Sequence, residues 1–466
     1  MQEEVSTMGE RPQAREPAPV PYASRRPELD VMRAFVVAGL VVFHSAVVFA
    51  SGSSWFVTDP RPSPGFTVVL LWGSLWGMPL LFVVSGMGAC YALRSRSAGA
   101  FLRERLGRLG VPLLTGLVLL VAPMFYLSRL GQPGFHEPYW RLWLRFLNPA
   151  AIATGIPARG TWRSGGDEFD PAHLWFLFSL LVLSIVLVPA FAYLRRPHGA
   201  RLIDRLAGLT ERHPAPALLL AAVPIMAVEA ALGPDKNTGG WERLTYLFFF
   251  LYGYLLAADR RFEHTLRRLR WWALGFAVSA SVLLAVAAKI LDPSAADVVS
   301  GVSPPVSAAQ GLAGWMWTAA ILGFAGTVAA RLATTGAGGS PGGSAASAPR
   351  WRRVARYGNE AVLPFYVLHE PVIVAVAWVV VRWSAPLPVK YLSVVAASFI
   401  LTLALYEGLV RRFQLTRFLF GMKPARPTGP IAHQTTPISA AAAARPTQEP
   451  DPGWAGPITP PGGTRA

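Results

Sequence analysis

The feature of this chain that most constrains its fold is a series of apolar runs, each about 17–25 residues long. A helix needs about 20 predominantly apolar residues to cross a hydrocarbon core about 30 Å thick. The chain has 466 residues, of which 53% are hydrophobic and only 15% are charged, which is less charge than a soluble protein of this length carries. The sequence therefore predicts an all-α, polytopic integral membrane protein.

Ten transmembrane helices are predicted from these runs. They lie near 33–53, 67–91, 111–128, 173–194, 214–232, 243–258, 271–290, 309–330, 361–381 and 391–410. The segments between them alternate in arginine content. Five arginines each occur in 93–110, 195–212, 259–270 and 331–356, whereas 54–66, 233–242, 291–308 and 382–390 hold two Lys/Arg or fewer. Since positive charge collects on the cytoplasmic side, both termini and the arginine-rich segments are predicted to be cytoplasmic.

The membrane domain is predicted to cover 29–422, between two tails. Residues 1–28 and 423–466 are rich in Pro, Ala and Thr or in mixed charges, and we expect them to be disordered and cytoplasmic. Within the domain, 129–172 is predicted to be a long external loop. The Gly/Ser/Ala-rich segment 333–349 is predicted to be a flexible cytoplasmic linker.

Charge and cysteine content exclude two classes of partner. The net charge of +17 is spread in short arginine groups between apolar runs, which indicates membrane topology and no nucleic-acid partner. The single cysteine, Cys90, excludes an intramolecular disulfide and a multi-cysteine metal site. No two histidines or carboxylates have the spacing of metal ligands, so no metal is expected.

The first span sets an arginine and a histidine on one helix face. In LDVMRAFVVAGLVVFH, Arg33 follows Asp30 at the entry and His44 lies inside the apolar run. Eleven residues separate Arg33 from His44, which is three turns plus about 20°, and about 16 Å along the axis. We expect Arg33 near the cytoplasmic surface and His44 near the bilayer middle. Such intramembrane groups are usually functional, although His44 could bond neighbouring helices and Arg33 could be an interfacial anchor.

The second span and the segment after it supply further candidates. Ser85 lies inside the span, where small residues also allow close helix packing. Arg105 and Arg108 follow three residues apart on a short helical stretch, with Arg103 nearby. Arginine binds phosphate oxygens through two parallel hydrogen bonds, so this group suits a phosphate site as well as simple snorkelling.

Three later positions complete the set of polar candidates. His173 opens the fourth span, His369 lies in the ninth beside Glu370 and Pro371, and Glu407 precedes the end of the last. Pro371 predicts a local break in its helix. For each position, hydrogen bonding between helices is the alternative to chemistry.

These segments together resemble the membrane acyltransferase-3 family, most closely its glucan-biosynthesis protein C-like branch. The matching stretches include LDVMRAFVVAGLVVFH, HLWFLFSLLVL, LFFFLYGYLL, YGNEAVLPFYVLHEPVIV and LALYEGLVRR, in the family's order over about 30–422. The family's signature, Arg or Lys followed by ten residues and His, falls on Arg33 and His44. Its FLxxRxxRLxxP pattern falls on Phe101 to Pro112.

The resemblance implies a membrane O-acyltransferase of the bacterial plasma membrane. Its donor would be acyl-CoA, as a co-substrate with no bound cofactor, and its acceptor a hydroxyl of an envelope carbohydrate, glucan or secondary metabolite. Arg33 and His44 would be catalytic, with His44 as general base or as carrier of the acyl group. Arg103, Arg105 and Arg108 would bind the CoA phosphates. Asp30, Ser85, His173, His369 and Glu407 would support the base or the acceptor.

Two other functions fit the same residues. A transporter or flippase of an envelope precursor would use Arg33 and His44 as its substrate or proton pathway. A non-catalytic membrane scaffold would use its arginine-rich segments to bind a partner. Tryptophans of the external loop, Trp140, Trp143 and Trp162, could stack on a sugar or anchor the loop at the interface.

Overall fold

The structure is a computed structural model that describes most of the membrane domain. The described residues are 27–53, 55–130, 132–147, 171–233, 244–291, 303–336 and 350–424. Nearly all of both predicted tails, most of the predicted linker and the centre of the predicted external loop, with Trp162, lie outside them.

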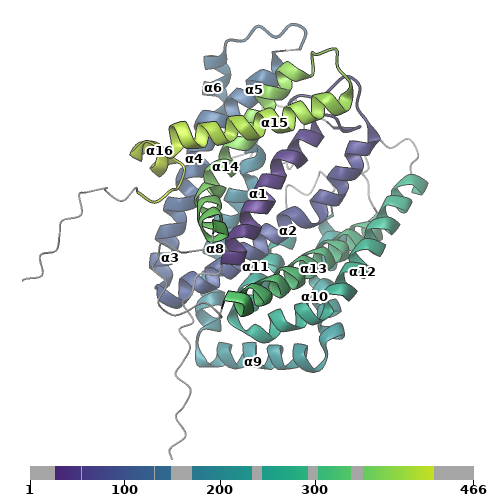
Figure 1. Cartoon of the computed structure of the whole chain (residues 1–466), viewed down its shortest axis with the longest axis vertical. Helices are drawn as coiled ribbons and strands as arrows, with labels where there is room; N and C mark the ends of the chain where they lie inside the picture. Colours follow the sequence, from purple (N-terminus) through teal and green to yellow (C-terminus); the bar gives the residue numbers. More distant parts are fainter. Residues whose placement is uncertain are drawn as a thin grey trace, which may run out of the picture. The chain divides into compact units, whose positions relative to one another are not determined.

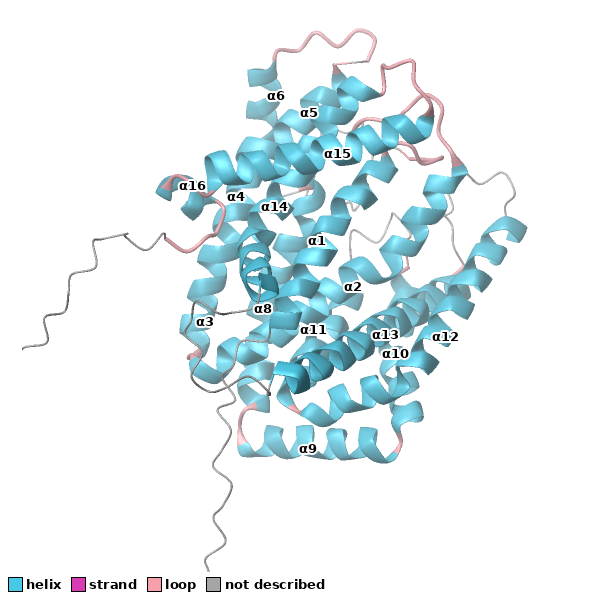
Figure 2. Cartoon of the chain, viewed as in Figure 1, coloured by secondary structure: helices cyan, strands magenta, loops and turns pink. Residues whose placement is uncertain are grey.

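The described part of the chain is built from helices, without a β-strand (Figure 2). Nine of its helices are long and apolar enough to cross a membrane. These spans are Glu28–Val47, Pro64–Ser95, Ala98–Arg129, Ala172–Leu194, Pro214–Leu232, Arg260–Ala287, Pro304–Val328, Arg356–Val380 and Leu387–Val410. Each overlaps one predicted span, and the polytopic all-α prediction is confirmed.

The remaining predicted span, 243–258, is a shorter apolar helix of 14 residues, α11 (Thr245–Ala258). It packs closely on α2 (Pro64–Ser95), and glycines on both helices allow the approach. A Cβ on Gly86 would lie 1.9 Å from the Phe250 carbonyl oxygen, and one on Gly253 would lie 1.9 Å from that of Val83. Gly86 therefore allows close helix packing, which was the structural alternative for the small residues of the second span.

The arginine-rich segments that the sequence predicted as connections between spans are helical in the structure. They form α3 (Ala98–Arg105), α9 (Pro197–Arg212) and the first turns of α12 (Arg260–Leu291). Arginine has a high helix propensity, and Ser97 caps α3 by accepting a hydrogen bond from the Ala100 amide. The span after α3 continues through η1 (Leu106–Gly110), α4 (Val111–Gly116), η2 (Leu117–Val121) and α5 (Ala122–Arg129).

These arginine-rich segments meet at one end of the helix assembly, here called the arginine-rich end (94–108, 195–212 and 257–270). Arg94 donates to the carbonyl oxygen of Ala257 at 2.6 Å, and Arg261 donates to Asp204 at 2.6 Å. The hydrogen bonds of Arg261 also hold the pKa of Asp259 below its usual range. Contact among these segments agrees with their predicted location on one side of the membrane.

Two arginine-poor connections meet at the opposite end (48–63 and 381–390). Lys390 Nζ donates to Asp59 Oδ2 at 2.7 Å and to the Val381 carbonyl oxygen at 2.9 Å, with both charged side chains buried. The Asp59 amide donates to Val48 O, so the connection folds back on the end of α1 (Pro27–Val47). The buried ion pair fixes this loop to the start of α15 (Leu387–Leu405).

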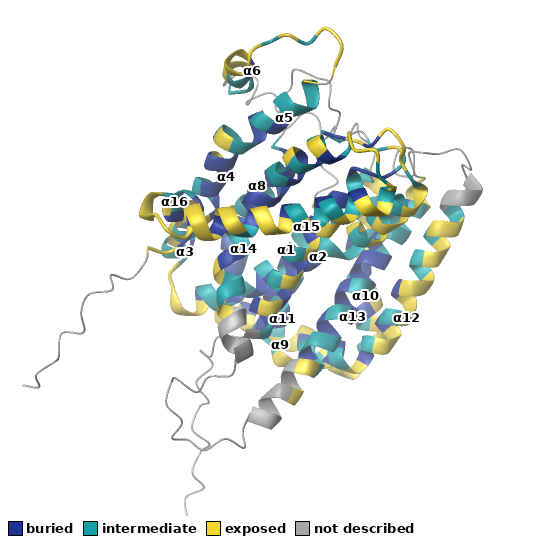
Figure 3. Ribbon diagram, turned by 45° about the horizontal axis from the view of Figure 1, so that its top comes forward, coloured by how far each residue is buried: buried dark blue, intermediate teal, exposed yellow. Residues whose placement is uncertain are grey.

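Helix α1 runs from near the arginine-rich end to the opposite end of the helix assembly. It packs against α2, α14 (Arg350–Val380) and α15 (Figure 1). It ends at Val47, earlier than the predicted span end at 53, so His44 lies in its last turn and not at its middle. The outer faces of α12 and α15 expose side chains, including the apolar Trp272 and Ile400, as expected of surfaces that face lipid (Figure 3).

Candidate active site

Three histidines and a glutamate from distant parts of the chain meet beside the last turn of α1. His44 comes from α1, His173 from η3 (Ala172–Leu174), and His369 and Glu370 from α14. His44 Nδ1 lies 3.1 Å from His369 Nε2 and 3.2 Å from Glu370 Oε2. His173 Nδ1 lies 3.5 Å from the same glutamate oxygen. The structure thus brings together three of the predicted site residues.

A proline in α14 shapes this cluster. Pro371 has no amide hydrogen, so the carbonyl of Val367, four residues earlier, lacks its helical partner. That carbonyl accepts a hydrogen bond from His173 Nε2 at 3.1 Å instead. The predicted break at Pro371 is wrong, because α14 runs on through it to Val380. The hydrogen bond from His173 replaces the one that the proline removes.

The hydrogen bonds assign a proton to each buried imidazole. A carbonyl only accepts, so His173 Nε2, which bonds Val367 O, carries a hydrogen. His369 Nδ1, 2.6 Å from Tyr366 O, carries one for the same reason. The Nε2 of a neutral His369 is then an acceptor, and the hydrogen between the two rings belongs to His44 Nδ1. In neutral His44 the other nitrogen, Nε2, therefore holds a free lone pair.

His44 is also the member of the cluster that is open to its surroundings. Its side chain is 16% exposed, whereas those of His173 and Glu370 are each 1% exposed and His369 is fully buried. Among the described residues, no hydrogen bond involves His44 Nε2. A reacting group can therefore reach this nitrogen, while the other ring nitrogens of the cluster face protein.

Glu370 is the member of the cluster that the sequence did not place among the site residues. It is buried between His44 and His173, and neither of its oxygens receives a well-aligned hydrogen bond from a described residue. His173 Nδ1 is also without one. A protonated His173 Nδ1, 3.5 Å from Glu370 Oε2, would balance the negative charge of this buried carboxylate.

The backbone before His173 is held in an unusual conformation. Ala172 has a φ of 48°, in the left-handed region that residues other than glycine rarely adopt, and it is fully buried. The Tyr366 hydroxyl donates to the His173 carbonyl oxygen, which ties η3 to α14. This strain and its compensating contact both serve to fix the position of His173.

A second group of predicted residues meets near the other end of α1. The guanidinium of Arg33 donates to Val84 O of α2 at 2.7 Å, in a space that a Cβ on Gly88 would obstruct at 2.7 Å. The charge of Arg33 interacts with those of Asp30 and Arg108, and the charge of Arg105 interacts with those of Arg33 and Arg108. Arg108 lies in the π-helical segment η1, and such segments are frequent at functional sites.

Comparison with known proteins identifies the family of the chain that carries the histidine cluster and the arginine group. Residues 26–407 match a family model described as an acyltransferase domain, that of the acyltransferase-3 family. The chain belongs to this family. It is therefore a multi-pass membrane member of the acyltransferase-3 family, and the resemblance drawn from the sequence is confirmed.

Individual relatives of this chain are known from bacteria. The chain is 26% identical to Glucans biosynthesis protein C of Escherichia coli strain 536 over 183 residues, which is 38% of this chain and 41% of the relative. The same protein of Escherichia coli strain HS is 26% identical over 178 residues, with the same coverage. The chain thus spans about two fifths of the length of the curated relatives it matches. No solved structure matches it.

Three predicted site residues lie apart from both groups. Arg103 is exposed on α3. Ser85 precedes Gly86 at the α2–α11 contact, and no hydrogen bond described here joins it to the histidines. Glu407 lies in η6 (Tyr406–Val410), where it pairs with Arg411 at 2.9 Å. Their roles in donor or acceptor binding remain predictions.

The histidine cluster also has the composition of a metal site. The ligand atoms of His44, His369 and Glu370 all lie within 4.8 Å of one another. Two imidazoles and a carboxylate form a common zinc ligand set. The sequence could not indicate this set, because α1 and α14 are 325 residues apart where these histidines meet. A hydrogen on His44 Nδ1 that is directed at His369 Nε2 also accounts for the short distance between these two nitrogens.

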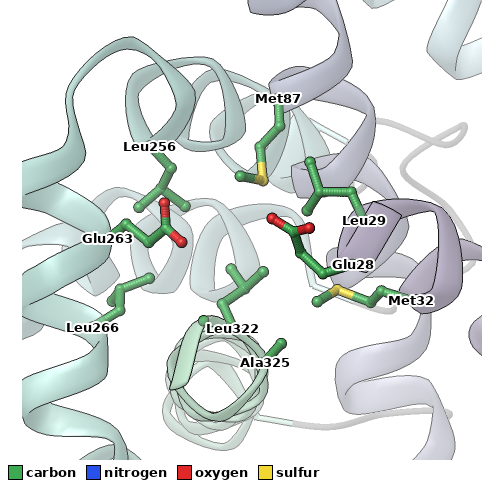
Figure 4. Close-up of a pocket in the computed structure, with 10 residues that line it drawn as sticks. Glu28, Leu29, Met32, Met87, Leu256, Glu263, Leu266, Leu322 and Ala325 are labelled. Atoms are coloured by element: carbon green, nitrogen blue, oxygen red, sulfur yellow. The ribbon is translucent and has the colours of Figure 1, made fainter. Parts of the chain in front are cut away.

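A small pocket lies on another side of α1, between α2, α11, α12 and α13 (Pro304–Gly336). Its lining includes Glu28 and Glu263, and Figure 4 shows both carboxylates pointing into it. None of the histidines lines it. This pocket is therefore distinct from the histidine cluster.

Proposed function

We propose that this acyltransferase moves an acyl group from acyl-CoA to a hydroxyl of an envelope carbohydrate, with His44 as general base. The observation that carries the proposal is the free, accessible Nε2 of His44, whose other nitrogen bonds His369 beside Glu370. A base must present a lone pair where the substrate can reach it, and its ring must be held in one orientation.

The arginine group supports the choice of donor. Arg33, Arg105 and Arg108 lie within electrostatic range of one another, and Asp30 and Glu104 offset only part of their charge, so the group stays positive and suits an anion. The phosphates of CoA are such an anion. Along α1, about 16 Å separates Arg33 from His44, and the extended arm of the donor would cover this distance to bring its thioester to His44.

The chemical step follows from these positions. His44 Nε2 takes the proton of the acceptor hydroxyl as its oxygen attacks the thioester carbonyl carbon. The carbon–sulfur bond then breaks, and the CoA sulfur leaves with the proton from His44 Nε2. The carboxylate of Glu370, 3.2 Å from His44 Nδ1, stabilises the imidazolium between these two transfers.

The position of His44 supports an acceptor from the end opposite the arginines. His44 lies in the last turn of α1, beside the 48–63 loop, so an acceptor from that side crosses little protein. The name of the relatives, Glucans biosynthesis protein C, supports a carbohydrate as the acceptor. We place the protein in the bacterial plasma membrane, with the arginine-rich end in the cytoplasm.

The protein reconstituted in vesicles with labelled acyl-CoA and a glucan oligosaccharide tests this proposal. We expect an acyl ester on the sugar and free CoA in equal amounts. The double variant R105A/R108A should raise the KM for acyl-CoA about tenfold, the worth of one charge-assisted hydrogen bond, with a smaller effect on kcat. Movement of the glucan across the membrane without thioester cleavage would instead support a transporter.

A further inference from the structure

We propose that Trp55 is the surface on which a sugar ring of the acceptor stacks beside His44. This inference rests on the proposed function and specifies its acceptor site. Trp55 lies in the loop that follows α1, at the end of the assembly opposite the arginines.

The aromatic neighbours of His44 indicate where an acceptor fits. The described rings beside it are those of Phe43, His369 and Trp55, with centroids 5.3, 5.1 and 6.3 Å from that of His44. Phe43 is the adjacent residue of α1, and His369 is buried behind the ring. Trp55 alone among these three comes from the connecting loop, and it is half-buried. It therefore borders the open side of His44.

The loop around Trp55 is braced on both sides. The indole of Trp55 meets the ring of Phe56 edge-on at 5.7 Å, and Phe56 meets Phe125 of α5 edge-on at 5.1 Å. On the other side, the buried pair of Asp59 and Lys390 fixes the loop to α15. A braced indole loses little conformational freedom when a ligand stacks on it, which favours binding.

The charges of the loop favour a neutral acceptor. Asp59 and Arg61 are its charged residues. Asp59 is buried and paired with Lys390, and Arg61 is exposed and directed to the Ala385 carbonyl oxygen. The buried pair is neutral as a whole, so Arg61 is the one charge that this loop presents, and the loop offers no cluster of charges for an ionic acceptor. A neutral sugar has an apolar C–H face that covers an indole, while its hydroxyls project from the ring edge, here toward His44.

Variants of Trp55 test this proposal in the reconstituted full chain. We expect W55A to raise the KM for a glucan oligosaccharide about tenfold, the worth of one aromatic contact. W55F, which keeps a ring, should raise it less. Transfer to glycerol, which has no ring to stack, should keep its kcat/KM in both variants. The control is W383A, since Trp383 is exposed at the same end, and it should leave both activities unchanged.

Two results would overturn the proposal. One is an unchanged KM for the oligosaccharide in W55A. The other is an equal loss toward oligosaccharide and glycerol, which would make Trp55 a structural support of His44. Either result leaves the acyl transfer of the unaltered protein intact. Failure of the proposed function would instead be an absence of transfer to any acceptor by the unaltered protein.

Discussion

The imidazoles of His44 and His369 stack nearly parallel, with centroids 5.1 Å apart and an interplanar angle of 17°. His44 Nδ1 and His369 Nε2 are 3.1 Å apart across this stack. Because the other nitrogen of His369 donates to Tyr366 O, the hydrogen between the rings must come from His44. A backbone carbonyl of α14 thereby decides which nitrogen of neutral His44 keeps a free lone pair.

Removing the charge of Glu370 should slow the chemical step. E370Q keeps the shape of the side chain but cannot stabilise the imidazolium of His44, so we expect kcat to fall about 10²-fold with the KM for acyl-CoA unchanged. The comparison is E360Q, since Glu360 lies on the same helix as Glu370 but pairs with Arg417 at 3.0 Å and not with the histidines. It should keep kcat within about twofold. Equal losses in the two variants would remove Glu370 from the mechanism.

Replacing Pro371 should make the protein more stable and less active. P371A restores an amide hydrogen that competes with His173 for the Val367 carbonyl. Alanine also suits a helix interior far better than proline. We expect a higher Tm in detergent and a kcat about tenfold lower, the worth of one lost hydrogen bond. A variant with unaltered kcat would show that the orientation of His173 does not matter to the reaction.

Breaking the buried pair at the opposite end should destabilise the fold. K390M leaves the carboxylate of Asp59 buried without its counter-charge, and we expect a loss of about 3–5 kcal/mol in the free energy of unfolding. The double variant K390M/D59L removes both charges and should recover most of it. Unfolding followed by tryptophan fluorescence measures both. If K390M unfolds like the unaltered protein, the pair does not hold the loop.

Zinc should inhibit this enzyme, and its removal should restore activity. His44, His369 and Glu370 hold ligand atoms within 4.8 Å of one another, so Zn²⁺ can displace the hydrogen between the rings and immobilise the base. A chelator alone should leave acyl transfer unchanged, because the proposed mechanism uses that hydrogen and no metal. Loss of activity with the chelator, and its return with Zn²⁺, would make the cluster a metal centre instead.

The sequence predicted the parts of this fold that depend on local patterns. Apolar runs located all ten predicted helices, and helical periodicity set Arg33 and His44 on one face of α1. The sequence placed the end of α1 too far along the chain, because the apolar run continues into Val48 and Phe49. These two residues are buried in the loop and not in the helix. For that reason His44 was expected near the bilayer middle and lies in the last turn.

The site itself depended on contacts that no local pattern reveals. Glu370 directly precedes Pro371, where the sequence predicted a break in the helix. In the structure α14 continues past Pro371, and Glu370 lies inside the helix. Trp55 lies in a short connection with no motif, and only the folding of that loop brings it to His44. Arg103 and Arg105 are two residues apart on α3, so Arg103 is exposed while Arg105 is partly buried with its guanidinium over the Phe101 ring.

The most direct test of this account is the transfer rate of H44A beside its affinity for acyl-CoA. If His44 is the base, kcat should fall about 10²–10⁴-fold. The Kd for acyl-CoA should stay unchanged, because the arginines bind the donor. Thioester turnover and ester formation at the unaltered rate in H44A would contradict the account.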